Sequence, residues 1–219
     1  MKEIIFFINI KKMIYKTKMI NVFWVVFLLI LNNFSSYSQK QLDESFKKIA
    51  SKSYDIEYQV PKSYFGIVVE GSGSYDPRAG YLQSSLMYSI KSRKHSIVVA
   101  FAIVSTKPDN TPRGIRIKEV FGDQNKISKV VLANQADTTL SKVRYIDSLQ
   151  LKKVNADRGA IYNIRINNKY MAVYGRCKKI ELYKDDVGRA EILFFYNKGD
   201  DILVDEEINK TWGMLKFKP

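Results

Sequence analysis

Residues 177–196 place two strand patterns on either side of a short polar break. Residues 180–183 alternate apolar and polar side chains, which is the period of a strand with one buried face. Residues 190–196 are apolar at nearly every position, as in a strand that is covered on both faces. The break at residues 185–188 is polar and ends in glycine. The pattern therefore predicts a β-hairpin inside a packed sheet rather than at its rim.

A second two-faced strand is predicted at residues 97–104, where every side chain is apolar. We expect it to lie beside the hairpin in the middle of the same sheet. Shorter alternating or apolar runs predict further strands at residues 54–60, 64–69, 81–90, 115–121, 160–167 and 169–174. Together these patterns predict an α+β fold, in which an antiparallel β-sheet is flanked by helices.

Three helices are predicted from apolar positions that recur every three or four residues. The first covers residues 41–52, and the second is placed around residues 140–149 with Asp137 as its N-cap. The third is an amphipathic C-terminal helix that begins near Asp200. We expect this helix to pack on one face of the sheet through a stripe of three apolar side chains, Ile208, Trp212 and Leu215.

The N-terminal segment, residues 1–38, has the layout of a secretory signal peptide. Lysines precede an apolar run at residues 20–31, and small serine residues follow it. The run is shorter than the ~20 residues that a membrane span needs. We therefore predict cleavage after Ser38 and one mature α+β domain over residues 39–219. An uncleaved N-terminal anchor is the alternative, and Met13 is a possible true start.

The chain is strongly basic, with a formal net charge of +14, of which residues 1–38 contribute +4. Such a balance is typical of nucleic-acid-binding proteins. However, the abundance of Lys, Asn, Ile, Tyr and Phe, which have AT-rich codons, explains much of the charge, and an exported protein rarely meets nucleic acid. We expect the partner to be an envelope protein or an anionic glycan or lipid headgroup. We expect no nucleic acid, and membrane contact only through an uncleaved leader.

Few side chains are suited to catalysis or metal binding. The sequence has one histidine, His95, and one cysteine, Cys177, too few for the clustered ligands of a zinc site. It has no Gly-x-Ser-x-Gly nucleophile elbow, and the acidic residues 200–207 lack the spacing of a calcium loop. Basic neighbours could make Cys177 reactive by lowering the pKa of its thiol, although a small residue at a strand start explains it as well. We predict no catalytic residue, no cofactor and no metal.

The segment around residues 64–81 combines aromatic side chains, an arginine and flexible glycines. Loops with this composition are enriched at binding surfaces. The alternative is that several of the tyrosines belong to the core and expose only the hydroxyl group to solvent. The basic turn at residues 93–95 is the second place where a partner would bind. The residues predicted to contact a partner are Tyr64, Phe65, Tyr75, Arg78 and Tyr81.

Two stretches resemble the PsbP/Mog1-type fold, which includes periplasmic lipoproteins and chaperones for secreted effectors. Residues 54–64, with alternating Tyr, Ile, Tyr and Val before Pro61 and an aromatic residue at Tyr64, are similar to the first strand of that group. The close of the chain, from a two-faced strand into an amphipathic helix that ends at residues 212–217, is similar to the last helix of that group. The resemblance implies an antiparallel sheet flanked by helices and a binding or assembly role without catalysis. It implies no site residues.

The leader also resembles those of exported proteins of Gram-negative envelopes, whose mature chains often begin with Gln, here Gln39. The sequence therefore predicts a non-catalytic, exported envelope protein, periplasmic or extracellular, that acts as a binding or assembly module. The alternative is a small periplasmic hydrolase whose polar residues converge only in the fold. A deep pocket that holds His95, or two carboxylates beside a nucleophile, would favour the hydrolase.

Overall fold

The computed structural model describes residues 39–67, 86–107, 110–112, 115, 119, 139, 142–165 and 173–219. The chain divides into two compact units, Met1–Leu42 and Asp43–Pro219. The predicted leader lies outside the described residues. None of the helices found in the described part is long and apolar enough to cross a bilayer. The fold presented below is that of the second unit.

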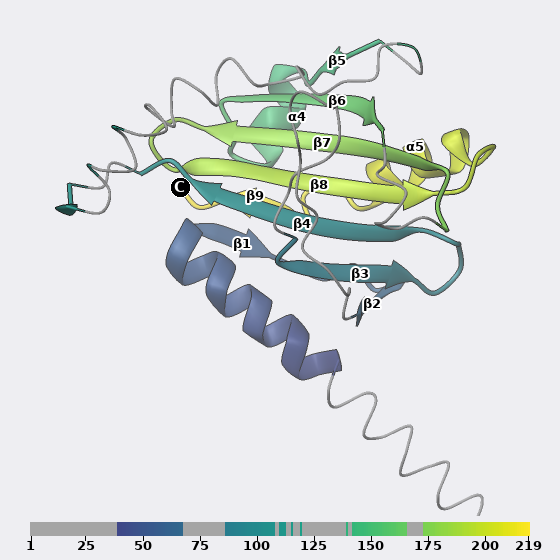
Figure 1. The fold of residues 1–219 in the computed structure, drawn as a ribbon, viewed down its shortest axis with the longest axis horizontal. Helices are drawn as coiled ribbons and strands as arrows, with labels where there is room; N and C mark the ends of the chain where they lie inside the picture. The colour runs from purple at the N-terminus through teal and green to yellow at the C-terminus, as the bar shows by residue number, and fades with distance from the viewer. Residues whose placement is uncertain are drawn as a thin grey trace, which may run out of the picture. The chain divides into compact units, whose positions relative to one another are not determined.

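Within this part of the chain, seven strands form an antiparallel sheet, which confirms the predicted α+β fold (Figure 1). A separate two-stranded sheet pairs β1 (Ile56–Tyr58) with β9 (Leu215–Phe217). In spatial order the large sheet consists of β2 (Tyr64–Ile67), β3 (Tyr88–Ser92), β4 (Val98–Ser105), β8 (Gly188–Tyr196), β7 (Arg176–Lys184), β6 (Arg158–Ile164) and β5 (Arg144–Tyr145).

The two-faced strands predicted from sequence are β4 and β8, and they are neighbours in the middle of the sheet, as expected. The predicted hairpin is also confirmed, because β7 pairs with β8 from Arg176↔Tyr196 to Lys184↔Gly188. Gly188 is needed at the end of the turn, since a Cβ there would lie 2.8 Å from the carbonyl oxygen of Val104. The expectation that the first strand of the hairpin has one wet face is wrong, because β7 is buried on both faces.

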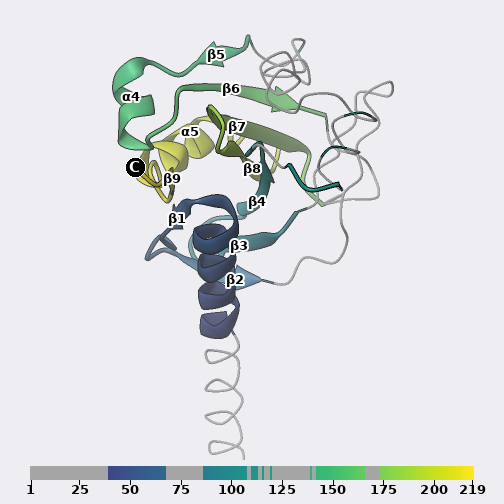
Figure 2. The same ribbon diagram turned by 90° about the vertical axis from the view of Figure 1, so that its left-hand side faces the viewer.

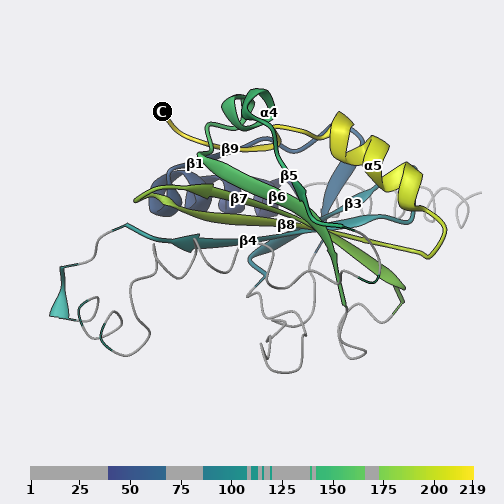
Figure 3. The same ribbon diagram turned by 90° about the horizontal axis from the view of Figure 1, so that it is seen from above.

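One face of the large sheet is covered by α5 (Asp201–Lys210), by the β1–β9 sheet and by residues 43–54 of the N-terminal helix (Figure 3). The N-terminal helix, predicted at residues 41–52, packs against the sheet through Phe46. Its ring stacks on Tyr88 and Phe101 with centroids 4.7 and 5.5 Å apart and meets Tyr58 edge-on at 4.9 Å. These four aromatic rings form the core beneath β3 and β4.

The C-terminal helix is shorter than predicted. It ends at Lys210, and the chain turns at Gly213, whose φ of 90° is readily adopted only by glycine. Leu215 therefore belongs to β9 rather than to the helix. Ile208 and Leu215 are both buried, as expected, whereas Trp212 is only half-buried and its indole Nε1 donates a hydrogen bond to the Gln150 carbonyl oxygen (3.3 Å).

The helix predicted around residues 140–149 is wrong in its extent. Residues 144–145 form the edge strand β5, and the helix α4 (Ser148–Lys153) begins only after them, with Asp147 as its N-cap. The predicted cap, Asp137, lies outside the described residues. A strand predicted at residues 115–121 is also wrong where it can be checked, since Ile115 and Glu119 are helical.

Candidate functional site at the basic edge of the sheet

Two of the five residues predicted to contact a partner, Tyr64 and Phe65, lie in the edge strand β2. The other three, Tyr75, Arg78 and Tyr81, lie outside the described residues. Alternation along β2 sends the Tyr64 side chain toward the face that α5 covers and the Phe65 side chain toward the opposite face. The two neighbouring residues therefore have different roles.

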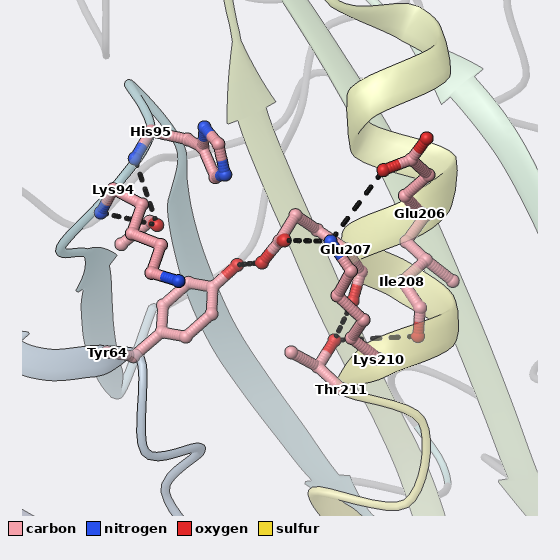
Figure 4. Close-up of polar contacts among 9 residues, drawn as sticks. Tyr64, Lys94, His95, Glu206, Glu207, Ile208, Lys210 and Thr211 are labelled. Carbon is pink, nitrogen blue, oxygen red and sulfur yellow. Dashed lines mark hydrogen bonds and ion pairs between the residues drawn. The ribbon is translucent and has the colours of Figure 1, made fainter.

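Tyr64 is a buried link between β2 and α5. Its hydroxyl group donates a hydrogen bond of 2.8 Å to Oε2 of Glu207, a buried residue in the second half of the helix (Figure 4). Burial raises the pKa of the Tyr64 hydroxyl, and the adjacent Glu207 carboxylate raises it further. Tyr64 therefore stays protonated and donates its hydrogen bond to the helix, so its hydroxyl group is engaged inside the protein.

Phe65, by contrast, supports a cation at the surface. The guanidinium carbon of Arg93 lies 5.2 Å from the centroid of the Phe65 ring, within the range of a cation–π interaction. Lys91 is the cross-strand partner of Phe65, so its exposed side chain lies on the same face of the sheet. The predicted aromatic residue and the predicted basic turn thus come together in the fold.

The basic turn at residues 93–95 is fixed by hydrogen bonds to Ser63, which precedes β2, and to Ser92 of β3. The Arg93 amide donates to the Ser63 carbonyl oxygen at 2.8 Å. The amides of Lys94 and His95 donate to the Ser92 hydroxyl oxygen at 3.3 and 3.2 Å. Figure 4 shows Lys94 and His95 beside Tyr64, facing the residues of α5 that surround Glu207. The backbone of the turn is therefore held in place, while its long basic side chains extend from it.

We call Lys62, Phe65, Lys91, Arg93 and Lys94 the basic edge. Its four cationic side chains are exposed, and within the described residues none of them lies within ion-pair distance of a carboxylate. The nearby α5 differs in this respect. There Lys210 Nζ lies 3.1 Å from Glu207 Oε1 and 3.7 Å from Glu206 Oε2. The positive charge of the basic edge is consequently not compensated by the part of the protein that the structure describes.

A second group of charges lies inside the sheet and was not anticipated from the sequence. Lys179 and Glu181 of β7 have no exposed side-chain surface, and Glu191 of β8 is nearly as buried. Lys179 Nζ lies 3.1 Å from Glu191 Oε2 and 3.9 Å from Glu181 Oε2. Arg189, which is partly exposed, places its Nε 3.2 Å from Glu191 Oε1 and 3.6 Å from Glu181 Oε1. We call these four residues the ion quartet.

The ion quartet has the properties of a structural cluster. Its two carboxylates and two cations balance, and the Tyr162 hydroxyl group donates a 2.6 Å hydrogen bond to Glu181 Oε2. Burial and the Glu181 carboxylate raise the pKa of Tyr162, which therefore remains a donor. Although two carboxylates lie together, both are held by cations and removed from solvent. This arrangement favours a role in holding β6, β7 and β8 in register over a role in acid–base catalysis.

The sequence carries a signal for the ion quartet that the alternation of a single strand does not reveal. Lys179 and Glu181 are two positions apart in one arm of the hairpin, and Arg189 and Glu191 are two apart in the other. Because side chains two apart share a face, each arm places a cation and a carboxylate on the same face. Glu181 and Glu191 are directly paired across the hairpin. The pairing of the two strands therefore indicates that the two cations and the two carboxylates are buried together with their charges balanced.

Cys177 lies in β7 inside a hydrophobic cluster with Leu193, Phe195 and Tyr162. Burial raises the pKa of its thiol, and the opposite effect of Lys179 is smaller. The thiol is therefore an inert core group, which agrees with the structural alternative and not with a reactive cysteine. His95 is half-buried in the basic turn. Among the residues that the structure describes, no group of three His, Cys, Asp or Glu side chains could hold a metal ion.

Comparisons with known proteins give little further information. No protein-family model matches the chain, and no curated protein matches it. A structural neighbour is the solution structure of cyanobacterial PsbP (CyanoP) from Synechocystis sp. PCC 6803, which is 8% identical with a TM-score of 0.40. The match covers 76% of this chain and 89% of that chain. The likeness is a weak fold resemblance to PsbP and carries no functional implication.

Proposed function

We propose that the protein is a non-catalytic, exported binding module that captures an anionic partner, an acidic envelope protein or an anionic glycan, through the basic edge. The observation that supports this most directly is the contrast between the two groups of charges. The charges inside the sheet are balanced, whereas Lys62, Lys91, Arg93 and Lys94 are exposed and uncompensated in the described structure. Uncompensated surface cations attract and orient anionic partners.

The stacking of Arg93 on Phe65 adds geometric specificity to this attraction. A guanidinium group presents a planar fork of N–H donors that matches a carboxylate, sulfate or phosphate group. Contact with the Phe65 ring restricts the orientation of that fork before a partner arrives. Less conformational entropy is then lost on binding, which increases affinity. Lys91, on the same face as Phe65, and Lys94, in the turn, add further positive charge near Arg93.

Binding is tested by salt elution of the full chain from a dextran sulfate column. Replacement of Lys91, Arg93 and Lys94 together by Ala is expected to lower the salt concentration at elution. The matched control replaces Lys47, Lys48 and Lys52, three exposed lysines of the helix of residues 39–54, and so removes the same charge. Equal shifts for both triple variants would show that only net charge matters and would contradict a defined basic edge.

A second variant separates geometry from charge. Phe65→Leu leaves every cation in place but removes the aromatic ring under Arg93. We expect it to elute at lower salt than wild type while its circular dichroism spectrum remains unchanged. Elution at the wild-type position with an intact fold would mean that the stacked geometry does not contribute to binding.

Export is the other part of the proposal and rests on the basic, apolar and small-residue layout of residues 1–38. In a Gram-negative host, mass spectrometry of the recovered protein should find an N-terminus at Gln39. A membrane-embedded chain that retains Met1 or Met13 would contradict cleavage.

A further inference from the structure

The edge of the sheet opposite β2 carries a different kind of surface. It consists of β5, α4 and the residues beside them, and we call it the β5–α4 edge. Tyr145 is 68% exposed and Leu149 is 75% exposed, although both are large apolar residues. Figures 1 and 2 both show β5 and α4 along the border of the sheet, away from β2 and β3.

The β5–α4 edge is also basic. Its exposed cationic side chains are Lys142, Arg144, Lys152 and Lys153. In the described part of the chain, no carboxylate lies within ion-pair distance of any of them. The one acidic residue of the segment, Asp147, accepts a hydrogen bond of 2.8 Å from the Gln150 amide as the helix cap. Among the described residues, four uncompensated cations therefore accompany the two exposed apolar side chains.

The segment is anchored from beneath, which leaves these side chains directed to solvent. Ile146 is buried, and its amide donates to the Gly159 carbonyl oxygen at 3.0 Å. Because Gly159 has no side chain, the Ile146 side chain can pack against it. A Cβ on residue 159 would lie only 2.6 Å from Ile146 Cδ1. The Trp212 indole holds the helix through the Gln150 carbonyl group. None of the α4 side chains is buried, so the helix is fixed without using Leu149.

We propose that the β5–α4 edge docks onto the surface of an anionic phospholipid bilayer. An acidic polymer would engage the cations but leave Tyr145 and Leu149 in water. At a bilayer interface both features are used, because tyrosine and aliphatic side chains enter the headgroup region while lysine and arginine remain at the phosphates. A cluster of about four basic residues is enough for recognition of anionic lipids. The sequence predicted membrane contact only through an uncleaved leader, and the β5–α4 edge adds a second site.

Docking in this way leaves the basic edge accessible. The two edges are separated by the width of the seven-stranded sheet. With neighbouring strands about 4.8 Å apart, that width is about 29 Å, between about three and four Debye lengths at physiological salt. A membrane at the β5–α4 edge therefore neither blocks the basic edge nor competes electrostatically for its ligand. The two surfaces are functionally independent.

The test uses an environment-sensitive maleimide dye attached to the full chain at Leu149→Cys. The native Cys177 thiol is buried, so the dye reports on position 149. On vesicles that contain phosphatidylglycerol, we expect a blue shift of the emission that zwitterionic vesicles do not produce. The matched control carries the dye at Ile202→Cys, an equally exposed position (78%) on α5, and should show no shift. The leader is identical in both proteins, so its own membrane affinity cannot create the difference.

Charge is tested with paired variants of the labelled protein. Replacing Lys152 and Lys153 by Ala should lower the partition coefficient for anionic vesicles about 30-fold, since each basic residue near the surface contributes about 1 kcal/mol. Replacing Lys47 and Lys48, two exposed helical lysines elsewhere, should leave it unchanged. Replacing Lys91, Arg93 and Lys94 should also leave it unchanged, which separates this site from the basic edge.

Three outcomes would overturn the proposal. The first is the absence of a shift at position 149 on anionic vesicles. The second is an equal loss of partitioning in the Lys152, Lys153 variant and in its Lys47, Lys48 control. The third is a shift that soluble dextran sulfate produces without vesicles, which would assign the β5–α4 edge to an acidic polymer.

Discussion

Lys179 shows how a buried charge is tolerated at the scale of one residue. It has no exposed side-chain surface and is held between Glu181 and Glu191. Removing one member of a buried ion cluster leaves its partners without compensation, which typically costs about 3–5 kcal/mol. We therefore expect Lys179→Met to lower the free energy of unfolding by about that amount, measured by urea denaturation.

The control for Lys179→Met is Lys216→Met, the same substitution in another cross-strand pair. Lys216 Nζ lies 3.2 Å from Glu57 Oε2, but the two side chains are 42% and 52% exposed. Exposed pairs contribute only about 0–1 kcal/mol. If both variants lose the same stability, burial does not determine the contribution of the ion quartet.

Asp43 gives a prediction for the dependence of stability on pH. Burial raises its pKa from the ordinary 3.8, and the neighbouring Glu44 adds to the effect. When the pKa of a carboxyl group is higher in the folded than in the unfolded protein, the group contributes its full stabilisation at pH values below the unfolded-state pKa. This stabilisation is lost as the pH rises through the folded-state pKa. Asp43→Asn cannot ionise and keeps an oxygen that accepts from the Tyr88 hydroxyl group.

The stability of Asp43→Asn relative to wild type is therefore expected to increase as the pH rises from below 3.8 through the raised pKa of Asp43. Thermal melts of both proteins at successive pH values measure this difference. A constant difference across the range would show that the carboxyl group does not titrate differently in the folded protein.

At this scale the sequence predicted the apolar core better than the polar contacts. Alternation identified Ile180 and Leu182 as buried, and they are. The same pattern assigned Glu181 to a wet face, because an isolated carboxylate cannot be buried without a partner. Its partners Lys179 and Arg189 reach it only through β-pairing and side-chain approach. For the same reason Tyr64 was predicted to contact a partner, although its hydroxyl group bonds to Glu207, 143 positions away.

The helix α5 illustrates what holds an element in place. Three of its acidic side chains accept bonds from the structure beneath, at distances of 2.7, 2.8 and 2.8 Å. They are Asp201 with Tyr196, Asp205 with Lys178, and Glu207 with Tyr64. These acidic residues connect the helix to strands β8, β7 and β2. Val204 and Ile208 are the buried apolar residues of the helix.

Docking of α5 is tested by two isoleucines of the same helix. Ile208 is buried, whereas Ile202 is 78% exposed. Truncation of a buried isoleucine to Ala typically costs about 2–5 kcal/mol, and surface substitutions usually change stability by less than about 0.5 kcal/mol. Urea denaturation should therefore separate Ile208→Ala from Ile202→Ala clearly. Similar losses in both would place Ile208 outside the core.

Elements were predictable where their periodicity was strong. The strands β4, β7 and β8 have long, regular patterns and were identified with nearly correct ends. The C-terminal helix was extended too far because Trp212 and Leu215 continue its apolar spacing, while the chain in fact turns at Gly213. The strand β9 that follows depends on pairing with β1, about 160 residues away, and such a pairing leaves no local pattern.

For the molecule as a whole, Cys177 is a natural probe of global unfolding. Its thiol is buried in the middle of the sheet, in a cluster contributed by β4, β6, β7 and β8. We expect maleimide labelling of Cys177 in the native protein to be slow and to accelerate in parallel with unfolding by urea. Leu149→Cys serves as the control and should label at once. Rapid labelling of Cys177 without denaturant would mean that the sheet opens locally.

The pairing of β4 with β8 determines when this molecule is able to fold. Partnered residues of the two strands are about 90 positions apart, and β8 lies in the last fifth of the chain. Until β8 has been synthesised, β4 has no neighbour on the side that becomes the centre of the sheet. The centre of the sheet therefore cannot close until most of the chain has been synthesised.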